Sequence, residues 1–255
     1  MLEVKQLVKN FDGLVAVDKV DLSIAKTEIR AVIGPNGSGK TTLINMISGV
    51  LPPTSGQIIF QGEDITGITP YDTTVKGICR TFQNLRIFPS LSVLEHVLLG
   101  MQCRGHANFF HTLFRMNTAQ REEKENVDKA MELLRFVGLE DRAHWMATGL
   151  PYGQRRLLEI ARALATDASL LLLDEPAAGL HSVEIPHLRE LILRIRERGI
   201  TILLVEHRMR LVMSVADQIS VLNYGQKIAE GTPEEIRKDK AVIEAYLGAP
   251  QQSPA

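Results

Sequence analysis

The sequence has few of the residues that mark secreted, metal-binding or membrane-spanning proteins. Among its 255 residues only Cys79 and Cys103 are cysteines, which is too few for a disulfide scaffold or a zinc site, and we expect both to be thiols, buried as small apolar side chains in a reducing compartment. No uncharged apolar run approaches the ~20 residues that a membrane-spanning helix needs. The N-terminus lacks the basic segment, apolar stretch and cleavage site of a secretory signal, so we expect a cytoplasmic location.

An excess of charge of either sign is also missing. Lys and Arg number 29 and Asp and Glu number 30, which is a formal net charge of −1. Such a surface does not attract nucleic acid or anionic lipid as a whole, so partners must be recognised locally. Hydrophobic residues make up 45% and charged residues 23%, as in an ordinary globular protein. At roughly 100–200 residues per domain, we expect one large domain or one domain with an insertion.

Three apolar runs predict the strands of a parallel sheet. Residues 29–33, 169–173 and 201–205 are almost continuously apolar, which is typical of strands covered on both faces. Residues 20–24 alternate between apolar and polar and predict a half-buried strand. Because helical patterns separate the runs, the chain is predicted to have an α/β fold.

The middle of the chain predicts helices instead. Residues 84–165 contain no comparable strand run, and residues 121–136 have apolar side chains at helical spacing, so we interpret this region as a helical subdomain inserted between sheet strands. Near the end, Thr-Pro-Glu-Glu at 232–235 forms a capping box that starts a short helix to about Leu247. Residues 249–255 are predicted to be a disordered tail.

A P-loop motif follows the first apolar run. Residues 34–41 match G-x-x-x-x-G-K-[ST] between the predicted strand at 29–33 and a helical pattern; the alternative is a glycine-rich turn beside an unrelated lysine. The glycines let backbone N–H groups curl around phosphate oxygens, Lys40 reaches the β- and γ-phosphates, and Thr41 offers its hydroxyl to Mg²⁺. The predicted nucleotide-binding residues are Gly34, Pro35, Asn36, Gly37, Ser38, Gly39, Lys40, Thr41 and Thr42.

Polar residues at other strand ends predict hydrolysis of the bound nucleotide. Asp174 and Glu175 end the second run; Asp174 suits a magnesium role, and Glu175 is placed to polarise a water against the γ-phosphate, unless the pair only solvates the strand end. His207 follows the third run, where α/β sheets present ligand-contacting residues, and we assign it to sensing the γ-phosphate, although an isolated histidine is more often structural. Gln83 follows a short apolar segment and is a candidate to reach Mg²⁺ and the attacking water.

The order of these motifs resembles the ATP-binding subunit of ABC transporters over residues 2–248. The resemblance implies that a signature segment at 150–154 contacts the γ-phosphate held on an opposite subunit, and therefore a head-to-tail dimer. It also implies that Phe11, where the family usually has Tyr, stacks on adenine; the alternative is a core-facing ring at a strand end. The residues matching the signature are Leu150, Pro151, Tyr152, Gly153 and Gln154.

Other segments look like one subgroup of that family. Residues 152–156, 176–180 and 231–248 are similar to the first of two ATP-binding subunits in high-affinity branched-chain amino acid importers. The apolar segment 106–116 lies where that subgroup has an extra stretch. It either packs on its own domain or is a contact surface for a permease loop.

Two residues depart from the family pattern. Pro151 stands where the signature has Ser, and Pro offers neither a hydroxyl nor an N–H to a phosphate. We hypothesise that the nucleotide site covered by Pro151 hydrolyses ATP poorly, whereas the chain's own P-loop site is complete once a sister subunit covers it. His181 stands where the family usually has Asp or Asn.

The resemblance implies a P-loop NTPase fold with a mainly parallel sheet, an antiparallel β portion and the inserted helical subdomain. It implies one domain over 1–248, with a nucleotide-binding core at 1–83 and 166–248 and the helical subdomain with the signature at 84–165. It further implies ATP and Mg²⁺ as cofactors and a place at the inner face of the membrane. The implied partners are permease subunits, a sister ATP-binding subunit or a second copy, and indirectly an extracytoplasmic solute-binding protein, but no nucleic acid.

Three other functions stay open on the sequence. One is the ATPase of lipopolysaccharide export or of another small-solute ABC transporter, since the cargo is selected outside this chain. The others are a soluble P-loop kinase and a nucleic-acid-associated ATPase. A kinase would need a second substrate pocket and a lid, and a nucleic-acid machine would need basic stripes or coiled-coil arms, which are not evident.

Overall fold

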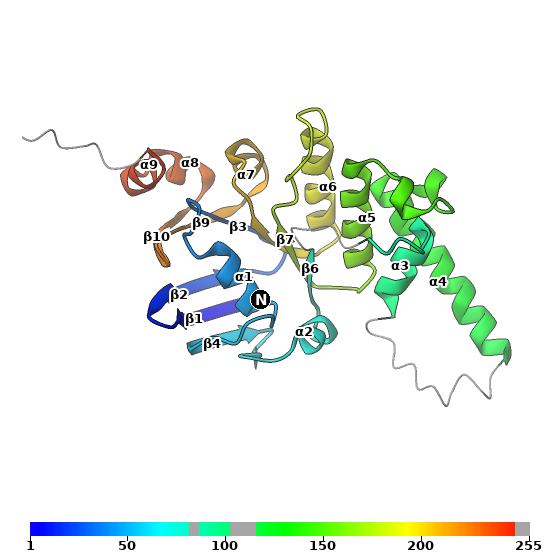
Figure 1. Ribbon diagram of the computed structural model, residues 1–255, viewed down its shortest axis with the longest axis horizontal. Helices are drawn as coiled ribbons and strands as arrows, with labels where there is room; N and C mark the ends of the chain where they lie inside the picture. Colours follow the sequence, from blue (N-terminus) through cyan, green and yellow to red (C-terminus); the bar gives the residue numbers. More distant parts are fainter. Residues whose placement is uncertain (82–86, 103–115, 248–255) are drawn as a thin grey trace, which may run out of the picture.

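The protein consists of two β-sheets and a group of helices beside them (Figure 1). A computed structural model describes residues 1–81, 87–102 and 116–247. Cys103, Gln83, most of the apolar segment 106–116 and the predicted tail lie outside these ranges. None of the helices in the described ranges combines the length and apolarity required to span a bilayer.

The smaller sheet is antiparallel and has the strand order β2-β1-β4-β5. Its longest strands alternate between buried and exposed residues where they pack on the core, as the pattern at 20–24 predicts. Its strands are β1 (Leu2–Phe11), β2 (Leu14–Ile24), β4 (Ser55–Phe60) and β5 (Glu63–Asp64).

The larger sheet has the order β10-β9-β3-β8-β7-β6, and its strands are parallel except for the antiparallel edge strand β10. The three apolar runs form its centre, which confirms the predicted mainly parallel sheet with an antiparallel portion. Its strands are β3 (Ile29–Ile33), β6 (Ile78–Thr81), β7 (Leu170–Asp174), β8 (Thr201–Val205), β9 (Gln218–Asn223) and β10 (Gln226–Gly231).

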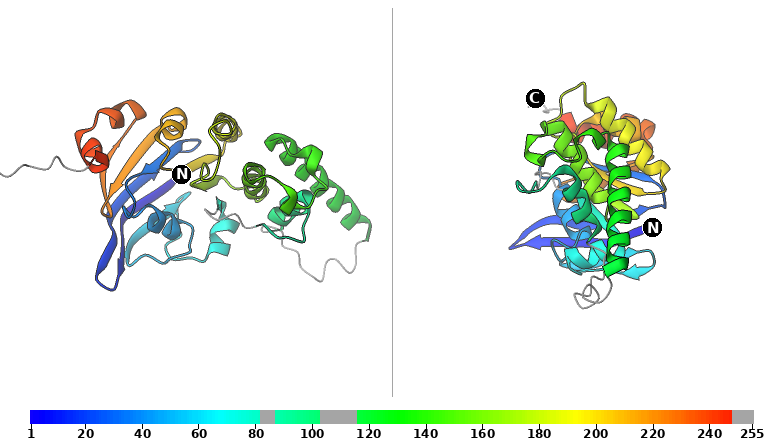
Figure 2. Two further views of the ribbon diagram at one scale, coloured as in Figure 1. Left: turned by 45° about the horizontal axis from the view of Figure 1, so that its top comes forward. Right: turned by 90° about the vertical axis from the view of Figure 1, so that its right-hand side faces the viewer.

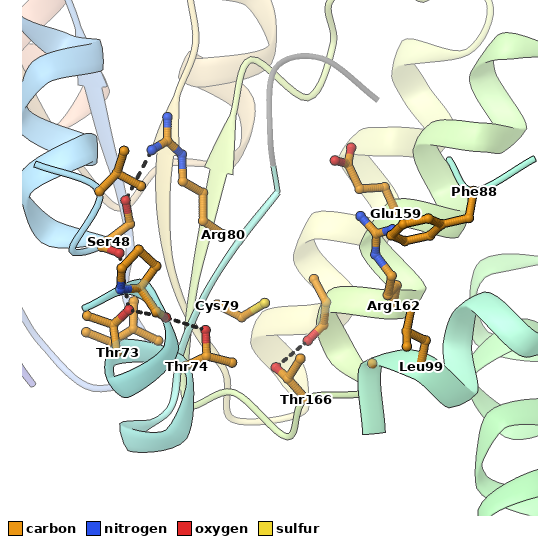
Figure 3. Close-up of a pocket in the computed structure, with 15 residues that line it drawn as sticks. Ser48, Thr73, Thr74, Cys79, Arg80, Phe88, Leu99, Glu159, Arg162 and Thr166 are labelled. Atoms are coloured by element: carbon orange, nitrogen blue, oxygen red, sulfur yellow. Dashed lines mark hydrogen bonds between the residues drawn. The ribbon is translucent and has the colours of Figure 1, made fainter. Parts of the chain in front are cut away.

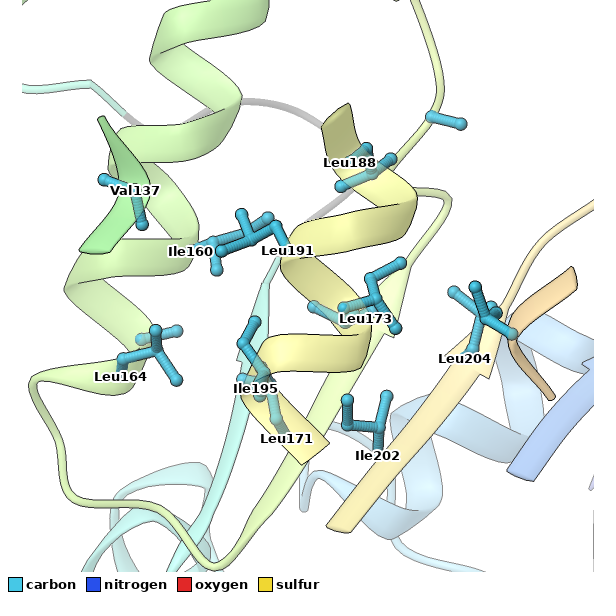
Figure 4. Close-up of a cluster of buried hydrophobic side chains, with 14 of the residues drawn as sticks. Val137, Ile160, Leu164, Leu171, Leu173, Leu188, Leu191, Ile195, Ile202 and Leu204 are labelled. Carbon is cyan, nitrogen blue, oxygen red and sulfur yellow. The ribbon is translucent and has the colours of Figure 1, made fainter. Parts of the chain in front are cut away.

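The central strands are mostly apolar because each faces a hydrophobic core on both sides. On β7, Leu170 and Leu172 pack in the core that holds α1 (Lys40–Ile47) between the two sheets. Leu171 and Leu173 point the other way, toward α5 and α6 (Figure 4). Strands β3 and β8 alternate in the same manner, so burial on both faces explains the continuous runs.

Further helices cover the face of the larger sheet toward which Leu171 and Leu173 point. The predicted capping box is present, with the Thr232 hydroxyl accepting from the Glu235 N–H. The expected single helix to Leu247 is wrong: Asp239 adopts an extended conformation, and its carboxylate accepts from the Val242 N–H, so it ends one helix and starts the next. The helices are α6 (Ile185–Glu197), α7 (Met209–Val215), α8 (Pro233–Lys238) and α9 (Lys240–Leu247).

The described residues within 84–165 form helices and no strand. Helices α3, α4 and α5 pack on one another at one end of the molecule, away from the small sheet (Figure 2). Helix α4 contains the predicted helix at 121–136 and ends before Gly138, whose φ is +76°. The division of the chain at 83 and 165 stays a prediction. The helices before β7 are α2 (Pro70–Lys76), α3 (Val93–Met101), α4 (Met116–Val137), the 3₁₀ turns Glu140–Arg142 and Ala147–Gly149, and α5 (Tyr152–Leu164).

Candidate active site

The P-loop joins β3 to α1, and two of its glycines lie where no side chain fits. Gly34 has a φ of +153°, and a Cβ there would lie 2.1 Å from the carbonyl oxygen of Leu222 on β9. Gly39 has a φ of +101°, and its Cβ would lie 2.5 Å from the carbonyl oxygen of Ala16 on β2. Backbone conformations of this kind favour glycine. The loop is therefore held between β9 and β2 at the start of α1.

The Lys40 ammonium lies inside this loop. Its Nζ donates to the carbonyl oxygens of Gly34 (2.9 Å) and Pro35 (2.8 Å) and to Oγ of Ser38 (3.3 Å). Burial lowers the pKa of Lys40, and the negative charge of Glu175 partly offsets this decrease. The lysine is thus electrostatically linked to the carboxylate that the sequence predicts as the base.

Asp174 and Glu175 lie where the central strands end. Asp174 pairs with Val205 of β8, and Val205 also pairs with Val32 of β3, so the carboxyl ends of β3, β7 and β8 meet at one edge. Glu175 has a φ of +46°, and its N–H donates to the Val205 carbonyl oxygen at 2.8 Å. A positive φ is uncommon outside glycine, and such strained residues cluster at functional sites.

His207 and Glu206 follow β8 at the same edge. Nδ1 of His207 lies 3.8 Å from Oε2 of Glu175, and the histidine side chain is 54% exposed. Glu206 is fully buried, and its carboxyl oxygens accept the backbone N–H groups of Ala177 (3.2 Å), His207 (3.0 Å) and Arg208 (3.1 Å). Glu206 therefore connects the loop after Glu175 to the loop that contains His207.

The sequence patterns do not reveal Glu206 or a second charged residue at this edge, Arg80. Arg80 lies on β6, and its Nη2 donates to Oδ2 of Asp174 at 2.7 Å. The sequence does show that Arg80 lies within a short apolar segment and that Glu206 directly follows one, and a charge at such a position is unusual. That signal does not say which loop or side chain the charge contacts, because the partners are distant in sequence.

The signature-like segment forms the start of α5. Pro151 is its N-cap and makes no side-chain capping bond. Oε1 of Gln154 accepts from Nη1 of Arg142, so this amide is held within the chain. A Cβ on Gly153 would lie 2.0 Å from Oε1 of Glu184, which shows that the Glu184 carboxylate lies directly over the signature glycine.

The rest of the segment also contacts the loop that follows Glu175. Leu150 is buried, whereas Tyr152 is 43% exposed, and a Cβ on Gly179 would lie 2.5 Å from Cε1 of the Tyr152 ring. The N–H of His181 donates to Oε2 of Glu184 at 2.7 Å and so helps to place that carboxylate. In Figure 1, β6 and β7 separate α5 from α1. The chain's own signature therefore does not lie over its own P-loop.

Phe11 is predicted to stack on adenine, but no contact among the described residues brings it to the site. Phe11 ends β1 at the tip of the β1–β2 hairpin, where the residue is 41% exposed and its ring centroid lies 5.1 Å from Nζ of Lys9. The same hairpin approaches the P-loop through Ala16. Gln83 lies outside the described residues.

The side-chain oxygens at this edge are of the kind that Mg²⁺ prefers. The described residues contain no cluster of three or more His, Cys, Asp or Glu able to hold a metal by themselves. Mg²⁺ is usually bound by one or two protein oxygens together with substrate phosphates and waters. Asp174 and Thr41 supply oxygens of this kind; Asn36, Gly37 and Thr41 are exposed and Thr42 is half-buried.

A pocket of about 260 Å³ lies beside the site, between the sheet region and α3 and α5. Arg80 and Cys79 of β6 form one wall, and Glu159 and Arg162 of α5 form the other (Figure 3). Phe88 and Leu99 close the side near α3. The pocket thus borders Arg80, whose guanidinium donates to the Asp174 carboxylate.

Comparisons with known proteins agree with this geometry. The family model described as ABC transporter matches residues 17–178, and the model described as branched-chain amino acid ATP-binding cassette transporter matches residues 226–251. The high-affinity branched-chain amino acid transport ATP-binding protein BraF of Pseudomonas aeruginosa is 43% identical over 97% of this chain and 98% of its own.

Solved structures are similar as well. An ATP-binding cassette of an ABC transporter in its ADP conformation has a TM-score of 0.85 and 35% identity, covering 97% of this chain and 98% of its own. A dimeric ATP-binding cassette in a post-hydrolysis state, bound to ADP and Pi, has a TM-score of 0.78 and 26% identity, covering 91% of this chain and 99% of its own. Together with the P-loop and the aligned strand ends, these matches show that the chain belongs to the ABC transporter family.

Proposed function

We propose that the protein is the ATP-binding subunit of an importer, which hydrolyses ATP to drive branched-chain amino acids through a separate membrane permease. The observation that supports hydrolysis is the meeting of strand ends at one edge. Lys40 lies within the P-loop, and Asp174, Glu175 and His207 lie at the ends of the strands beside it. Such an arrangement combines phosphate binding with a base for water.

Each of these residues has a distinct task in this proposal. The P-loop N–H groups and Lys40 bind the phosphates, and Phe11 stacks on adenine. Glu175 accepts a proton from the attacking water, and His207 senses the γ-phosphate beside it. Thr41, Asp174 and Gln83 would hold Mg²⁺, which would supply positive charge against the charge that develops on the phosphates.

The active assembly in this proposal is a head-to-tail dimer. The signature of this chain lies away from its own P-loop, so a second subunit has to cover the nucleotide. The relative bound to ADP and Pi is dimeric, which supports a dimer for this chain as well. We propose a sister ATP-binding subunit as the partner, because Pro151 makes the two nucleotide sites unequal.

The cargo and the permease follow from the relatives. BraF is named for branched-chain amino acid transport, and the end of this chain matches the model named for that transport. These two matches favour branched-chain amino acids over lipopolysaccharide or another solute. The chain works at the inner face of the membrane, where ATP is present, and the solute-binding protein acts outside.

Two substitutions test the assignment of hydrolysis. In the purified transporter, Glu175→Gln is expected to bind ATP as the unaltered protein does but to lose turnover about 100-fold or more, as for removal of a general base. Lys40→Ala is expected to weaken ATP binding itself. Unchanged turnover in Glu175→Gln would refute the role of the base.

The cargo is tested separately. The native complex is purified, and the ligand retained by its solute-binding protein is identified by mass spectrometry. Leucine, isoleucine or valine is expected. Retention of an amide, urea or another polar solute would refute the cargo and leave the ATPase assignment intact.

A further inference from the structure

Arg80 connects the Asp174 carboxylate to the helix that follows the P-loop. Its Nη2 donates to Oδ2 of Asp174 at 2.7 Å, and its Nη1 donates to Oδ1 of Asn45 at 2.6 Å and Oγ of Ser48 at 3.1 Å. Asn45 and Ser48 belong to α1 and its C-cap. Figure 3 shows Arg80 extending from β6 to Ser48. One guanidinium thus joins β6, β7 and α1.

Burial of the Arg80–Asp174 pair restricts how the Asp174 carboxylate can be oriented. The side chains of Arg80 and Asp174 are 9% and 4% exposed, so neither charge is well solvated by water. Among the described residues, Arg80 is the one side chain that donates to the Asp174 carboxylate. A planar guanidinium offers donors in a fixed fork, which sets the orientation of its acceptors more strictly than an ammonium does. The orientation of Asp174 is therefore determined by Arg80 and its anchor on α1.

The anchor matters because α1 also provides the other oxygen ligand. Thr41 lies in the first turn of α1, and Asn45 is four residues further along the same helix. Residues separated by four positions lie on one side of a helix. A link from Asn45 through Arg80 to Asp174 therefore fixes the carboxylate relative to the helix that presents the Thr41 hydroxyl.

We propose that Arg80 is a positioning residue that holds Asp174 in the orientation required for Mg²⁺ and keeps it in register with α1. The proposal rests on the proposed binding of Mg²⁺ and ATP. It concerns metal binding and does not depend on turnover or on the cargo. Residues that orient metal ligands typically change metal affinity by about 10–100-fold when they are removed.

The test compares nucleotide binding with and without the metal. Arg80→Met keeps the length of the side chain and removes its charge and donors. The affinity for a fluorescent ATP analogue in EDTA is expected to stay within about twofold of the unaltered protein, whereas the Mg²⁺ concentration at half-maximal enhancement rises about tenfold or more. Arg80→Lys is expected to recover part of this loss, because it restores the charge but not the fork.

A matched control is Arg30→Met. Arg30 is also buried and is held by Glu28, Ser220 and Glu230, but it lies at the opposite end of β3 from the P-loop. This variant is expected to lose stability without a change in the Mg²⁺ dependence. A change in Mg²⁺ dependence equal to that of Arg80→Met would overturn the proposal, because the loss of any buried arginine would then produce the same effect.

Two further outcomes would also overturn it. If Arg80→Met weakens ATP binding equally in EDTA and in Mg²⁺, Arg80 only maintains the fold. If Mg²⁺ binds more tightly to the variant, Arg80 competes with the metal.

Should Arg80→Met not fold, Asn45→Ala removes one anchor and leaves the ion pair with Asp174 in place. It is expected to shift the Mg²⁺ midpoint upward by about threefold, as for one hydrogen bond, and no shift would refute the link to α1. A protein that binds no ATP at all would instead disprove the proposed function.

Discussion

Buried charges at the ends of strands organise this site at the scale of single residues. Arg80 joins β6 and β7 to α1, and Glu206 joins the loops after β7 and β8. Removing one partner of a buried pair is strongly destabilising because the other is left without compensation. These residues therefore affect the fold and the site together, and their effects can be separated only by matched substitutions.

Glu206→Ala is expected to destabilise the protein by about 3 kcal/mol, at roughly 1 kcal/mol for each of three backbone N–H groups that lose their acceptor. Glu206→Gln keeps one oxygen and is expected to lose about half as much. Urea unfolding followed by circular dichroism measures both. An unfolding free energy of Glu206→Ala equal to that of the unaltered protein would contradict the bridging role.

His96 gives the stability a dependence on pH. Its Nε2 accepts the Phe88 N–H at 3.0 Å, and its Nδ1 lies 2.8 Å from the Ser92 carbonyl oxygen, to which the neutral ring donates. Burial lowers the pKa of His96 from its ordinary value of 6.5, and the charge of Arg162 lowers it further, while Ser92 and Glu95 oppose the decrease. The folded protein thus favours the neutral ring.

The direction in which stability changes with pH follows from proton uptake by the unfolded chain. Below about pH 6.5 the unfolded chain binds a proton at His96 before the folded chain does, so stability falls as the pH falls from 6.5 toward the lowered pKa. Well above pH 6.5 neither state binds this proton, so the group contributes no pH dependence there. His96→Gln is expected to lose this part of the decrease, as measured by unfolding midpoints between pH 7.5 and about 5. Parallel curves for the two proteins would contradict the assignment.

At the scale of elements, the sequence predicts those helices and strands that have a local pattern of residues. The apolar runs predict β3, β7 and β8, because strands buried on both faces consist mostly of apolar residues. The P-loop motif likewise predicts the strand, loop and helix around Gly34 and Gly39. Contacts between distant segments have no such pattern, which is why the Arg80–Asp174 pair and the Glu184 carboxylate over Gly153 emerge only from the structure.

Helix boundaries show the same limit. The capping box at Thr232 predicts where α8 begins, because its partners are three residues apart. The break at Asp239 is missed, because an aspartate within a helical pattern either continues the helix or caps the next one. The choice depends on how α8 and α9 pack on the sheet.

Pro151→Ser tests whether the start of α5 limits one nucleotide site. Pro151 already has the extended backbone of an N-cap, with φ −55° and ψ 154°. A serine there adds a capping hydrogen bond that stabilises the fold by about 1 kcal/mol. It also lowers the stability by about 1 kcal/mol, because the unfolded chain without the proline has more conformational freedom. The net change in stability is therefore expected to stay below about 1 kcal/mol, so a change in turnover reports contact with the phosphate.

The measurement uses a mixed dimer in which Glu175→Gln silences this chain's own P-loop site. The remaining turnover then comes from the site that Pro151 covers. Adding Pro151→Ser is expected to raise it on the order of tenfold, as for one hydrogen bond to a charged group. An unchanged rate would count against the proposed inequality of the two sites.

At the scale of the whole molecule, the P-loop and the signature lie on different sides of β6 and β7 (Figure 1). In the proposed dimer, each nucleotide site therefore combines the P-loop of one chain with the signature of the other. The signature also has its Gln154 amide held by Arg142 and its glycine covered by Glu184. A partner whose own signature presents a serine is therefore expected to cover this P-loop better than a second copy does.

This difference predicts how the dimer forms. With Glu175→Gln to prevent turnover, ATP is expected to join this chain to the sister ATP-binding subunit in a 1:1 complex at micromolar concentration, while the chain alone stays largely monomeric. Two copies would each cover the other's ATP with Pro151, which lacks a donor for the phosphate. Sedimentation velocity with and without ATP distinguishes the species. Equally strong self-association would show that Pro151 does not weaken the interface, and Lys40→Ala, which weakens ATP binding, provides the control for a dimer that forms without nucleotide.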